Sequence, residues 1–364
     1  MICYDVISLS CLGPQSPEVT EILDNSAVIL AKRPEGLPST GDFALETRAL
    51  GSRADGAVRC ETLYLSLDPY MRSVIAGNHM GHGVDPGQVV PGEVVARVVE
   101  SDDPDWQPGT LVRCQGGWQR FSDHRAGELS RLPAGLSRPS LALSILGMPG
   151  LTAWAGMVHQ AKVRAGDVVV IPAAVGGVGA MAAQLARRAG ATTIAVTSGK
   201  EKRRIALETL GYDHCIDRVD EDLSEALSRV APEGVSVYFD LVGDPTLTTV
   251  AQQLSIGGRV VLCGLIKDYN GDHKTTGPHP GLWITKRATV SGLVVYDYEP
   301  MRGAFESEFV PLGEAGELVA NEEIHEGLAA APDAFCQLMR GLNTGKVVVK
   351  LDHCRTEYEA HHNQ

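Results

Sequence analysis

The sequence predicts an α/β protein in which a doubly wound parallel sheet is joined to a second, β-rich domain. From about residue 141, β-branched runs alternate with helical segments, a pattern that requires crossovers between parallel strands. Before that point, apolar and polar residues alternate in short runs separated by Gly and Pro, which is typical of a barrel-like domain. A length of 364 residues fits about two domains of ordinary size.

The elements of the β-rich part are predicted from their alternation. Residues 24–57 are less regular and are predicted to form surface loops. Near the C-terminus a helix and a strand are expected to rejoin this part of the chain. The predicted strands are 61–67, 92–101, 109–114 and 346–351, and the predicted helix is 333–341.

The elements of the parallel sheet are predicted from β-branched runs and from helices that end in Gly or precede the next run. The predicted strands are 167–171, 192–197, 214–217, 235–242, 259–264 and 288–295. The predicted helices are 180–190, 200–211, 222–230 and 245–254.

Charge and cysteine usage exclude several classes of protein. The net charge of −13 argues against a nucleic-acid binder. The eight cysteines are scattered and form no C-x-x-C pair, so no disulfide framework is expected. The apolar stretch 168–186 is interrupted by Pro172 and Gly176, which favours strand, turn and helix over a membrane span. The N-terminus resembles a signal peptide poorly, and we expect a cytoplasmic protein without a membrane partner.

A glycine-rich turn lies where the first predicted strand of the sheet meets its helix. Ala174, Gly176 and Gly179 occupy the three spaced positions of a dinucleotide fingerprint. Glycine permits a tight turn and close approach of the backbone to a diphosphate, which the helix N-terminus also attracts. A plain structural turn is the alternative, but the strand before and the helix after favour dinucleotide binding.

The end of the second predicted strand indicates which dinucleotide is bound. A site for NAD normally places Asp or Glu there, whereas this chain has Ser198 and Gly199. The cations that follow suit a 2′-phosphate, and they are Lys200, Lys202, Arg203 and Arg204. A solvated helix face balanced by neighbouring glutamates is the alternative. The missing acid favours NADP(H).

Searches for a metal site or a covalent nucleophile give nothing specific. His79 and His82 lie in a Gly-rich run without a further ligand at zinc spacing, and we interpret them as surface-loop histidines. The chain has no G-x-S-x-G and no H-E-x-x-H. The chemistry is therefore expected to depend on the cofactor, with no metal.

Several stretches together resemble the zinc-independent medium-chain dehydrogenase/reductases, and most closely the prostaglandin reductase and 2-alkenal double-bond reductase family. Where zinc-dependent relatives have Gly-His-Glu, this chain has Pro91-Gly92-Glu93. The stretches that resemble the family are LYLSLDPYMR (63–72), GMPGLTAW (147–154), AAVGGVG (173–179), EKRRIALETLGYD (201–213), VYFDLVG (237–243), CGLIKDYN (263–270) and NTGKVVVK (343–350).

The resemblance implies domains and a site. It implies a Rossmann NADP(H)-binding domain at 141–305, a GroES-like catalytic domain at 1–140 and 306–364, and a homodimer. The implied cofactor residues are Gly176, Gly177, Val178, Gly179, Ser198, Lys202, Arg218, Leu241, Cys263, Gly264, Leu265, Ile266, Tyr269, Leu293, Val294 and Asn343. The implied substrate residues are Tyr70, Cys114, Gln115, Tyr269, Val294 and Val295.

The chain departs from the family pattern in four places. Arg218 replaces a tyrosine near the 2′-phosphate, and a guanidinium can bind phosphate through two hydrogen bonds. Leu241 replaces a polar cofactor contact, and Lys267 and Asp268 add charge beside Tyr269. The polar loop 271–283 also differs, and such loops often determine specificity.

The implied reaction is NADPH-dependent reduction of a carbon–carbon double bond conjugated to a ketone or aldehyde. Hydride would attack the β-carbon, and a hydrogen-bond donor would stabilise the enolate. Tyr269 is the candidate donor and so the candidate catalytic residue, because a phenol stays protonated at neutral pH. Two alternatives stay open: an NADPH-dependent quinone reductase, and an NADPH-binding sensor or structural protein without turnover.

Overall fold

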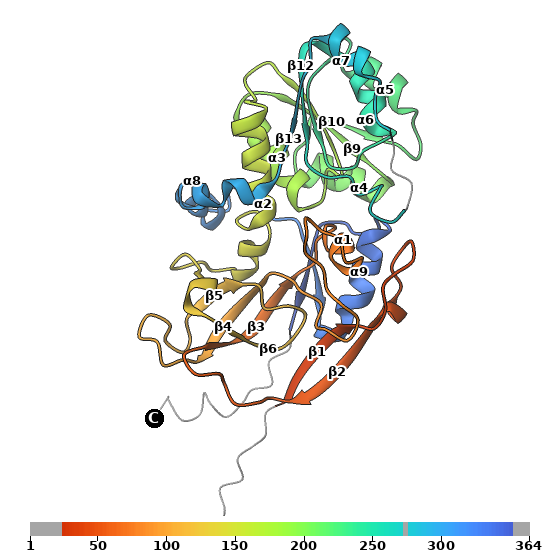
Figure 1. Cartoon of the computed structure of the whole chain (residues 1–364). Helices are drawn as coiled ribbons and strands as arrows, with labels where there is room; N and C mark the ends of the chain where they lie inside the picture. Colours follow the sequence, from red (N-terminus) through yellow and green to blue (C-terminus); the bar gives the residue numbers. More distant parts are fainter. Residues whose placement is uncertain (1–23, 272–275, 352–364) are drawn as a thin grey trace, which may run out of the picture.

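The β-branched runs form one six-stranded sheet in which all neighbouring strands are parallel. The computed structural model describes residues 24–271 and 276–351 (Figure 1). The strands are β8 (Val168–Pro172), β9 (Thr192–Thr197), β10 (His214–Asp217), β11 (Val235–Asp240), β12 (Leu254–Leu262) and β13 (Thr289–Gly292). Their order is β10-β9-β8-β11-β12-β13, which is the doubly wound order with its reversal between β8 and β11.

Helices cover both faces of this sheet. Alternate residues of β8 enter different cores: Val169 and Ile171 pack with Met181, and Val170 packs with Leu227. Both faces are buried because a helical layer lies on each. The helices are α3 (Gly177–Arg188), α4 (Lys200–Arg204), α5 (Leu223–Val230), α6 (Thr246–Gln252) and α7 (Pro280–Lys286). A π-helical turn at 205–209 continues α4. The six-stranded sheet and these helices are called the parallel-sheet half below.

The other half, called the β-rich half, contains a seven-stranded sheet. The order is β14-β15-β3-β4-β5-β7, with β6 pairing on β3. The strands are β3 (Val58–Ser66), β4 (Val94–Glu100), β5 (Leu111–Cys114), β6 (Phe121–His124), β7 (Ser130–Arg131), β14 (Glu322–Glu326) and β15 (Lys346–Lys350). Since β15 returns from the C-terminal part to pair with β3, the chain crosses between the halves twice (Figure 1). The predicted domain boundaries remain predictions.

The prediction of surface loops at 24–57 is wrong. β1 (Asp24–Leu30) and β2 (Phe43–Ala49) pair antiparallel, and Val28 and Leu30 are fully buried. The Phe43 ring stacks on Trp118, with the ring centroids 5.5 Å apart. Only one end of this ribbon is buried, so most of β2 is polar and lacks the signal of a core strand. The interpretation of the N-terminal residues 1–23 lies outside the described residues.

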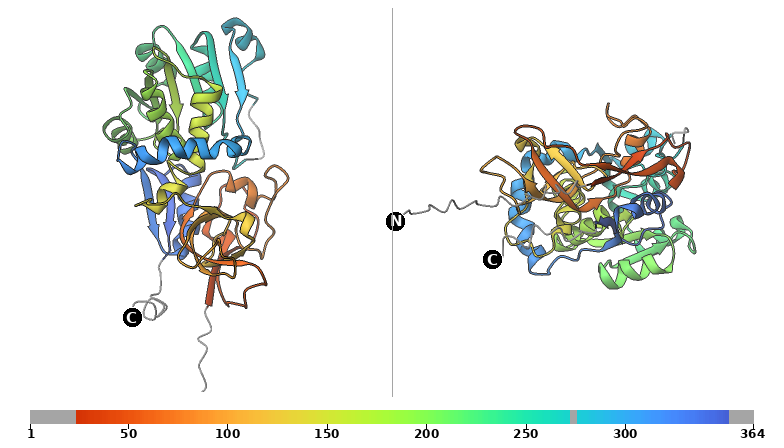
Figure 2. Two further views of the ribbon diagram at one scale, coloured as in Figure 1. Left: turned by 90° about the vertical axis from the view of Figure 1, so that its left-hand side faces the viewer. Right: turned by 90° about the horizontal axis from the view of Figure 1, so that it is seen from below.

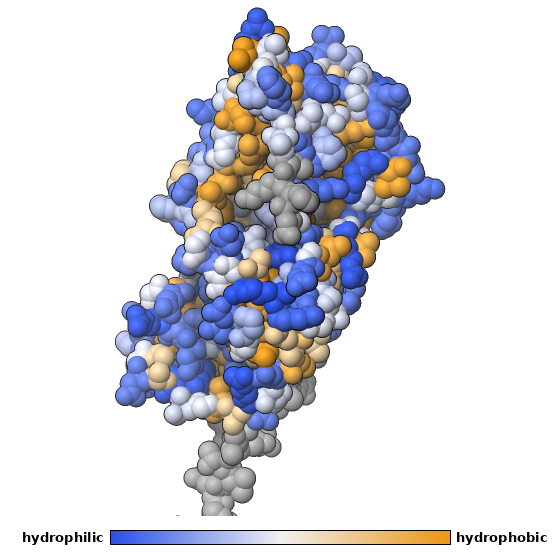
Figure 3. Space-filling model, turned by 45° about the vertical axis from the view of Figure 1, so that its right-hand side comes forward, coloured by the Kyte–Doolittle hydropathy of each residue, from blue (hydrophilic) through white to orange (hydrophobic). Residues whose placement is uncertain are grey.

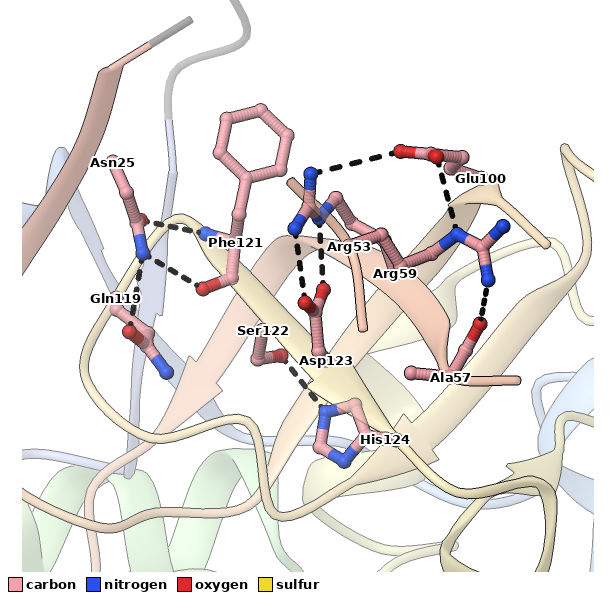
Figure 4. Close-up of polar contacts among 10 residues, drawn as sticks. All are labelled: Asn25, Arg53, Ala57, Arg59, Glu100, Gln119, Phe121, Ser122, Asp123 and His124. Atoms are coloured by element: carbon pink, nitrogen blue, oxygen red, sulfur yellow. Dashed lines mark hydrogen bonds and ion pairs between the residues drawn. The ribbon is translucent and has the colours of Figure 1, made fainter. Parts of the chain in front are cut away.

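Paired charges hold β6 and a neighbouring loop on the outside of β3 (Figure 4). The guanidinium of Arg59 donates to both carboxylate oxygens of Asp123, at 2.8 and 2.9 Å. Arg53 donates to Glu100 at 3.1 Å and to the Ala57 carbonyl at 2.6 Å. Each cation of this cluster therefore has an acidic partner.

Helices at the junction connect the two halves (Figures 1 and 2). α2 (Met148–Trp154) follows a tight turn, and a Cβ at Gly150 would lie 1.9 Å from the Ile145 carbonyl oxygen of that turn. Trp154 of α2 packs against Phe305 of α8 (Arg302–Glu314), with ring centroids 5.8 Å apart. The remaining α-helices are α1 (Met71–Ile75) and α9 (Ala331–Met339). None of the helices in the described ranges has both the length and the apolar composition needed to cross a bilayer.

Candidate active site

A cleft of about 520 Å³ is lined by residues of both halves. It lies at the carboxyl ends of β8, β9, β11 and β12, which is where doubly wound sheets bind ligands. Figure 3 shows the junction of the two halves from one side.

The glycine turn forms one end of the cleft. Gly176 is the N-cap of α3, so the first amides of this 12-residue helix have no carbonyl partner within it. A Cβ at Gly179 would lie 2.7 Å from the Ala173 carbonyl oxygen, so the helix can pack this closely on the strand only with glycine. At Gly177 a Cβ would lie 3.0 Å from Pro149. The turn thus has the space and the amide donors that a diphosphate requires.

Cations gather where β9 and β10 end. Ser198, Lys202 and Arg218 all line the cleft. The Lys202 ammonium donates to the Gly341 carbonyl at 2.6 Å. Burial lowers the pKa of Lys202, the nearby Arg218 lowers it further, and Glu323 opposes both. This positive end is suited to a phosphate group.

A carboxylate supports the loop that carries Ser198 without lining the cleft. Asp217 is 1% exposed, and its Oδ1 accepts hydrogen bonds from the Gly199 amide at 2.8 Å and the Val219 amide at 3.1 Å. The acid therefore shapes the turn after β9 from beneath, and it does not stand where a ribose would meet it.

The other end of the cleft contains Tyr269. Its hydroxyl oxygen accepts a hydrogen bond from the Leu265 amide at 3.4 Å. Burial is the main cause that raises the pKa of Tyr269, so the phenol is neutral at physiological pH. It donates no hydrogen bond among the described residues, which leaves its proton for a ligand.

Aromatic side chains from the β-rich half face this end. The rings of Tyr70 and His79 lie with centroids 5.0 Å apart, and both line the cleft. Burial raises the pKa of Tyr70 well above its usual value and lowers that of His79. His79 lies in a loop, as interpreted, but the tight turn at 79–82 makes it half-buried and part of the cleft lining. His82, its partner in that turn, is exposed.

A buried ion pair lines the cleft beside the glycine turn. Lys346 is 4% exposed and donates to Asp68 and to the Leu67 carbonyl, both at 2.7 Å. Its Cδ lies 3.1 Å from the Cβ position of Gly177, so the two halves touch there. Sequence analysis missed this pair because the residues lie 278 positions apart.

Most of the residues implied by the resemblance meet in this one cleft. Leu265 does not line it, and neither do Cys114 or Gln115. Cys114 is 5% exposed and packs in the core of the β-rich half, where Cys60 and burial raise its pKa; Gln115 points to solvent. The lining residues among those predicted are Tyr70, Gly176, Gly177, Val178, Gly179, Ser198, Lys202, Arg218, Leu241, Cys263, Gly264, Ile266, Tyr269, Leu293, Val294, Val295 and Asn343.

Within residues 24–271 and 276–351, no group of three or more His, Cys, Asp or Glu side chains is arranged to hold a metal ion. The fold and cleft define a class of protein, in which a dinucleotide binds at the edge of a parallel sheet and a second molecule binds against a β-rich half. This is the arrangement of a nucleotide-dependent oxidoreductase.

Comparison with known proteins defines the family. Residues 26–132 match the family described as the N-terminal domain of oxidoreductase, and residues 177–309 match zinc-binding dehydrogenase. The chain is 36% identical over 334 residues to the NADPH-dependent curcumin reductase of Escherichia coli (strain K12), covering 90% of this chain and 97% of that protein. It is 35% identical over 327 residues to prostaglandin reductase 1 of Bos taurus, covering 88% and 97%.

A solved structure is equally similar. CurA from Vibrio vulnificus, in complex with NADPH, has a TM-score of 0.85 and 34% identity, covering 90% of this chain and 99% of that one. The chain therefore belongs to the zinc-independent medium-chain dehydrogenase/reductases. The predicted family, fold class and enzyme class are confirmed, and the predicted cofactor agrees with the NADPH named for two of these relatives.

The residues of the cleft fit NADP(H). The turn at 176–179 has no Cβ at three of its four positions, and its helix N-terminus faces the cleft. Lys202 and Arg218 supply positive charge beyond the carboxyl ends of the neighbouring strands β9 and β10, without an acid in the position that favours NAD. When bound, this cofactor supplies a hydride.

Proposed function

We propose that this protein reduces the carbon–carbon double bond of an α,β-unsaturated ketone or aldehyde, with NADPH as cofactor. The observation that carries the proposal is the neutral Tyr269 hydroxyl, which lines the cleft with its proton available. The relatives named as curcumin reductase and prostaglandin reductase support it.

Each end of the cleft has a distinct part in the proposed mechanism. The amides at 177–179 and the cations Lys202 and Arg218 hold the phosphates, so that the dinucleotide lies along the carboxyl edge of the sheet. Leu293 and Val294 provide apolar contacts in the lining of the cleft, where they exclude water. A low-dielectric surrounding strengthens the hydrogen bond that a single donor offers to a developing charge.

Tyr269 acts on the substrate oxygen. As the β-carbon accepts a hydride, negative charge moves to the carbonyl oxygen and forms an enolate. The Tyr269 hydroxyl donates to that oxygen, while the Leu265 amide holds the phenol oxygen in place. A proton then adds to the α-carbon, and we propose that it comes from water.

The test is Tyr269→Phe. We expect kcat to fall about a hundredfold, the usual cost of one such donor, while the Kd of NADPH is nearly unchanged. The matched control is Tyr64→Phe, which removes a hydroxyl from β3 at a position outside the cleft lining. Unchanged turnover of Tyr269→Phe would refute the catalytic role.

An acceptor panel tests the reaction class. NADPH oxidation with 2-nonenal should exceed that with a benzoquinone at equal concentration. Faster oxidation with the quinone would favour a quinone reductase. Tight NADPH binding without oxidation by any acceptor would favour a sensor or structural protein.

We also propose a cytoplasmic homodimer. The support is β13, which is an edge strand of the six-stranded sheet, with Val290 38% exposed. Ile284 of the adjacent α7 is 77% exposed, and Figure 3 shows apolar residues on the surface of the parallel-sheet half. Pairing of two such edges would cover both. Sedimentation velocity tests it: a monomer at micromolar concentration would contradict the proposal.

A further inference from the structure

The C-terminal turn of α9 is bound by side chains from the opposite half. α9 belongs to the β-rich half, and its last carbonyls lack partners within the helix. Asn270 donates from the parallel-sheet half to the Met339 carbonyl at 3.4 Å, and Lys202 donates to the Gly341 carbonyl at 2.6 Å. The residue between these two acceptors is Arg340. It is therefore fixed at the junction by contacts on both sides.

Arg340 is exposed and is one of the residues that line the cleft. Within the described ranges it forms no ion pair, although other arginines near this end do. Arg203 pairs with Glu221 at 3.0 Å, and Arg204 pairs with Glu201 at 2.7 Å. An arginine that faces a ligand cleft without an acid beside it is available for an anion.

The local charges are also consistent with a role for a further cation. A 2′-phosphate has a charge near −2. Glu323 lies close enough to Lys202 to affect its pKa, and it also accepts from the Thr344 amide at 2.6 Å. Its negative charge opposes phosphate binding, as does the carbonyl end of α9. A cation at position 340 offsets both.

We propose that Arg340 binds the 2′-phosphate of NADPH together with Lys202 and Arg218, so that both halves select the cofactor. The inference rests on the proposed cofactor and does not depend on the substrate. It adds a residue from the β-rich half to a phosphate site that otherwise consists of the parallel-sheet half.

The test measures dinucleotide affinity without any acceptor. For Arg340→Gln we expect the Kd of NADPH to rise about tenfold, because a charge-assisted hydrogen bond is lost. The Kd of NADH should change less than about twofold, because NADH has no 2′-phosphate. Arg340→Lys should retain part of the preference. The matched control is Arg203→Gln, whose guanidinium is paired and does not line the cleft.

Three outcomes would overturn the proposal. Equal weakening of NADPH and NADH would place Arg340 on a part that both cofactors share, such as the diphosphate or the adenine. An unchanged Kd for NADPH would remove it from the site. Equal affinity of the unaltered protein for both dinucleotides would overturn the proposed cofactor as well. If the protein does not reduce an enone but Arg340→Gln still weakens NADPH binding as expected, only the proposed substrate class is refuted.

Discussion

The arginines of β3 and of the loop before it differ in their partners from the cations at the phosphate end of the cleft. Arg59 and Arg53 are each bound to carboxylates (Figure 4). In the cleft, Lys202 donates to a backbone carbonyl, and Arg218 and Arg340 form no ion pair within the described ranges. In a chain of net charge −13, acidic partners are abundant. The difference teaches that the paired arginines around β3 stabilise the fold, whereas Lys202, Arg218 and Arg340 are available to a ligand.

The largest effect is expected when the charge of Lys202 is removed from the cleft. Lys202→Met should weaken NADPH binding about tenfold to a hundredfold, because it removes a half-buried cation from the phosphate site. Titration with NADPH and NADH checks it, with Lys200→Met as the control on the same helix outside the cleft lining. A parallel loss for NADH would show that Lys202 does not distinguish the two dinucleotides.

The matching substitution removes a charge from the cluster around β3. Arg59→Met removes two hydrogen bonds to Asp123 and should lower the free energy of unfolding by about 1–2 kcal/mol. The Kd of NADPH should stay the same. Urea unfolding measures the change in the free energy of unfolding, and dinucleotide titration measures the Kd of NADPH. A stable variant with weaker NADPH binding would reverse the roles assigned to the two regions.

A pH titration sharpens the assignment of Lys202. Its pKa in the free protein lies below 10.5, because burial disfavours the ammonium. As pH rises through that lowered pKa, the cation is lost and NADPH affinity falls, beginning below 10.5. NADH affinity should change less over the same range. In Lys202→Arg the guanidinium stays charged, so the alkaline loss should disappear; its persistence would assign the titration to another group.

The smallest effect concerns His124 of β6, which is buried on the face opposite to Asp123. Burial lowers its pKa below 6.5, and its Nε2 lies 2.8 Å from the Ser122 hydroxyl. Since the folded pKa is depressed, the contribution to stability is present above about pH 6.5 and is lost as pH falls through the folded pKa. His124→Gln should therefore reduce the slope of unfolding free energy against pH below 6.5. An unchanged slope would exclude His124 as a source of acid sensitivity.

The strands β8 to β11 of the parallel sheet could be predicted closely because they are buried on both faces. β9 and β10 begin and end at the predicted residues, and the glycine turn is the N-terminus of α3. In this region local composition and tertiary burial agree, so a pattern within one segment was sufficient.

The residues that were missed depend on contacts between distant segments. His79 enters the cleft because a turn folds onto Tyr70, and Arg340 faces it because Lys202 and Asn270 hold the end of α9. Cys114 was expected at the substrate, but the alternation of β5 directs it into the core. Neither kind of placement leaves a signal in a single stretch of sequence.

The return of β15 to β3 has a mechanical consequence. The parallel-sheet half is attached by two chain segments, one through α2 and one through α8 (Figure 1). The parallel-sheet half can rotate about the line that joins these two segments, whereas sliding or twisting would strain both of them. Widening of the gap between the halves is therefore restricted to one rotational degree of freedom.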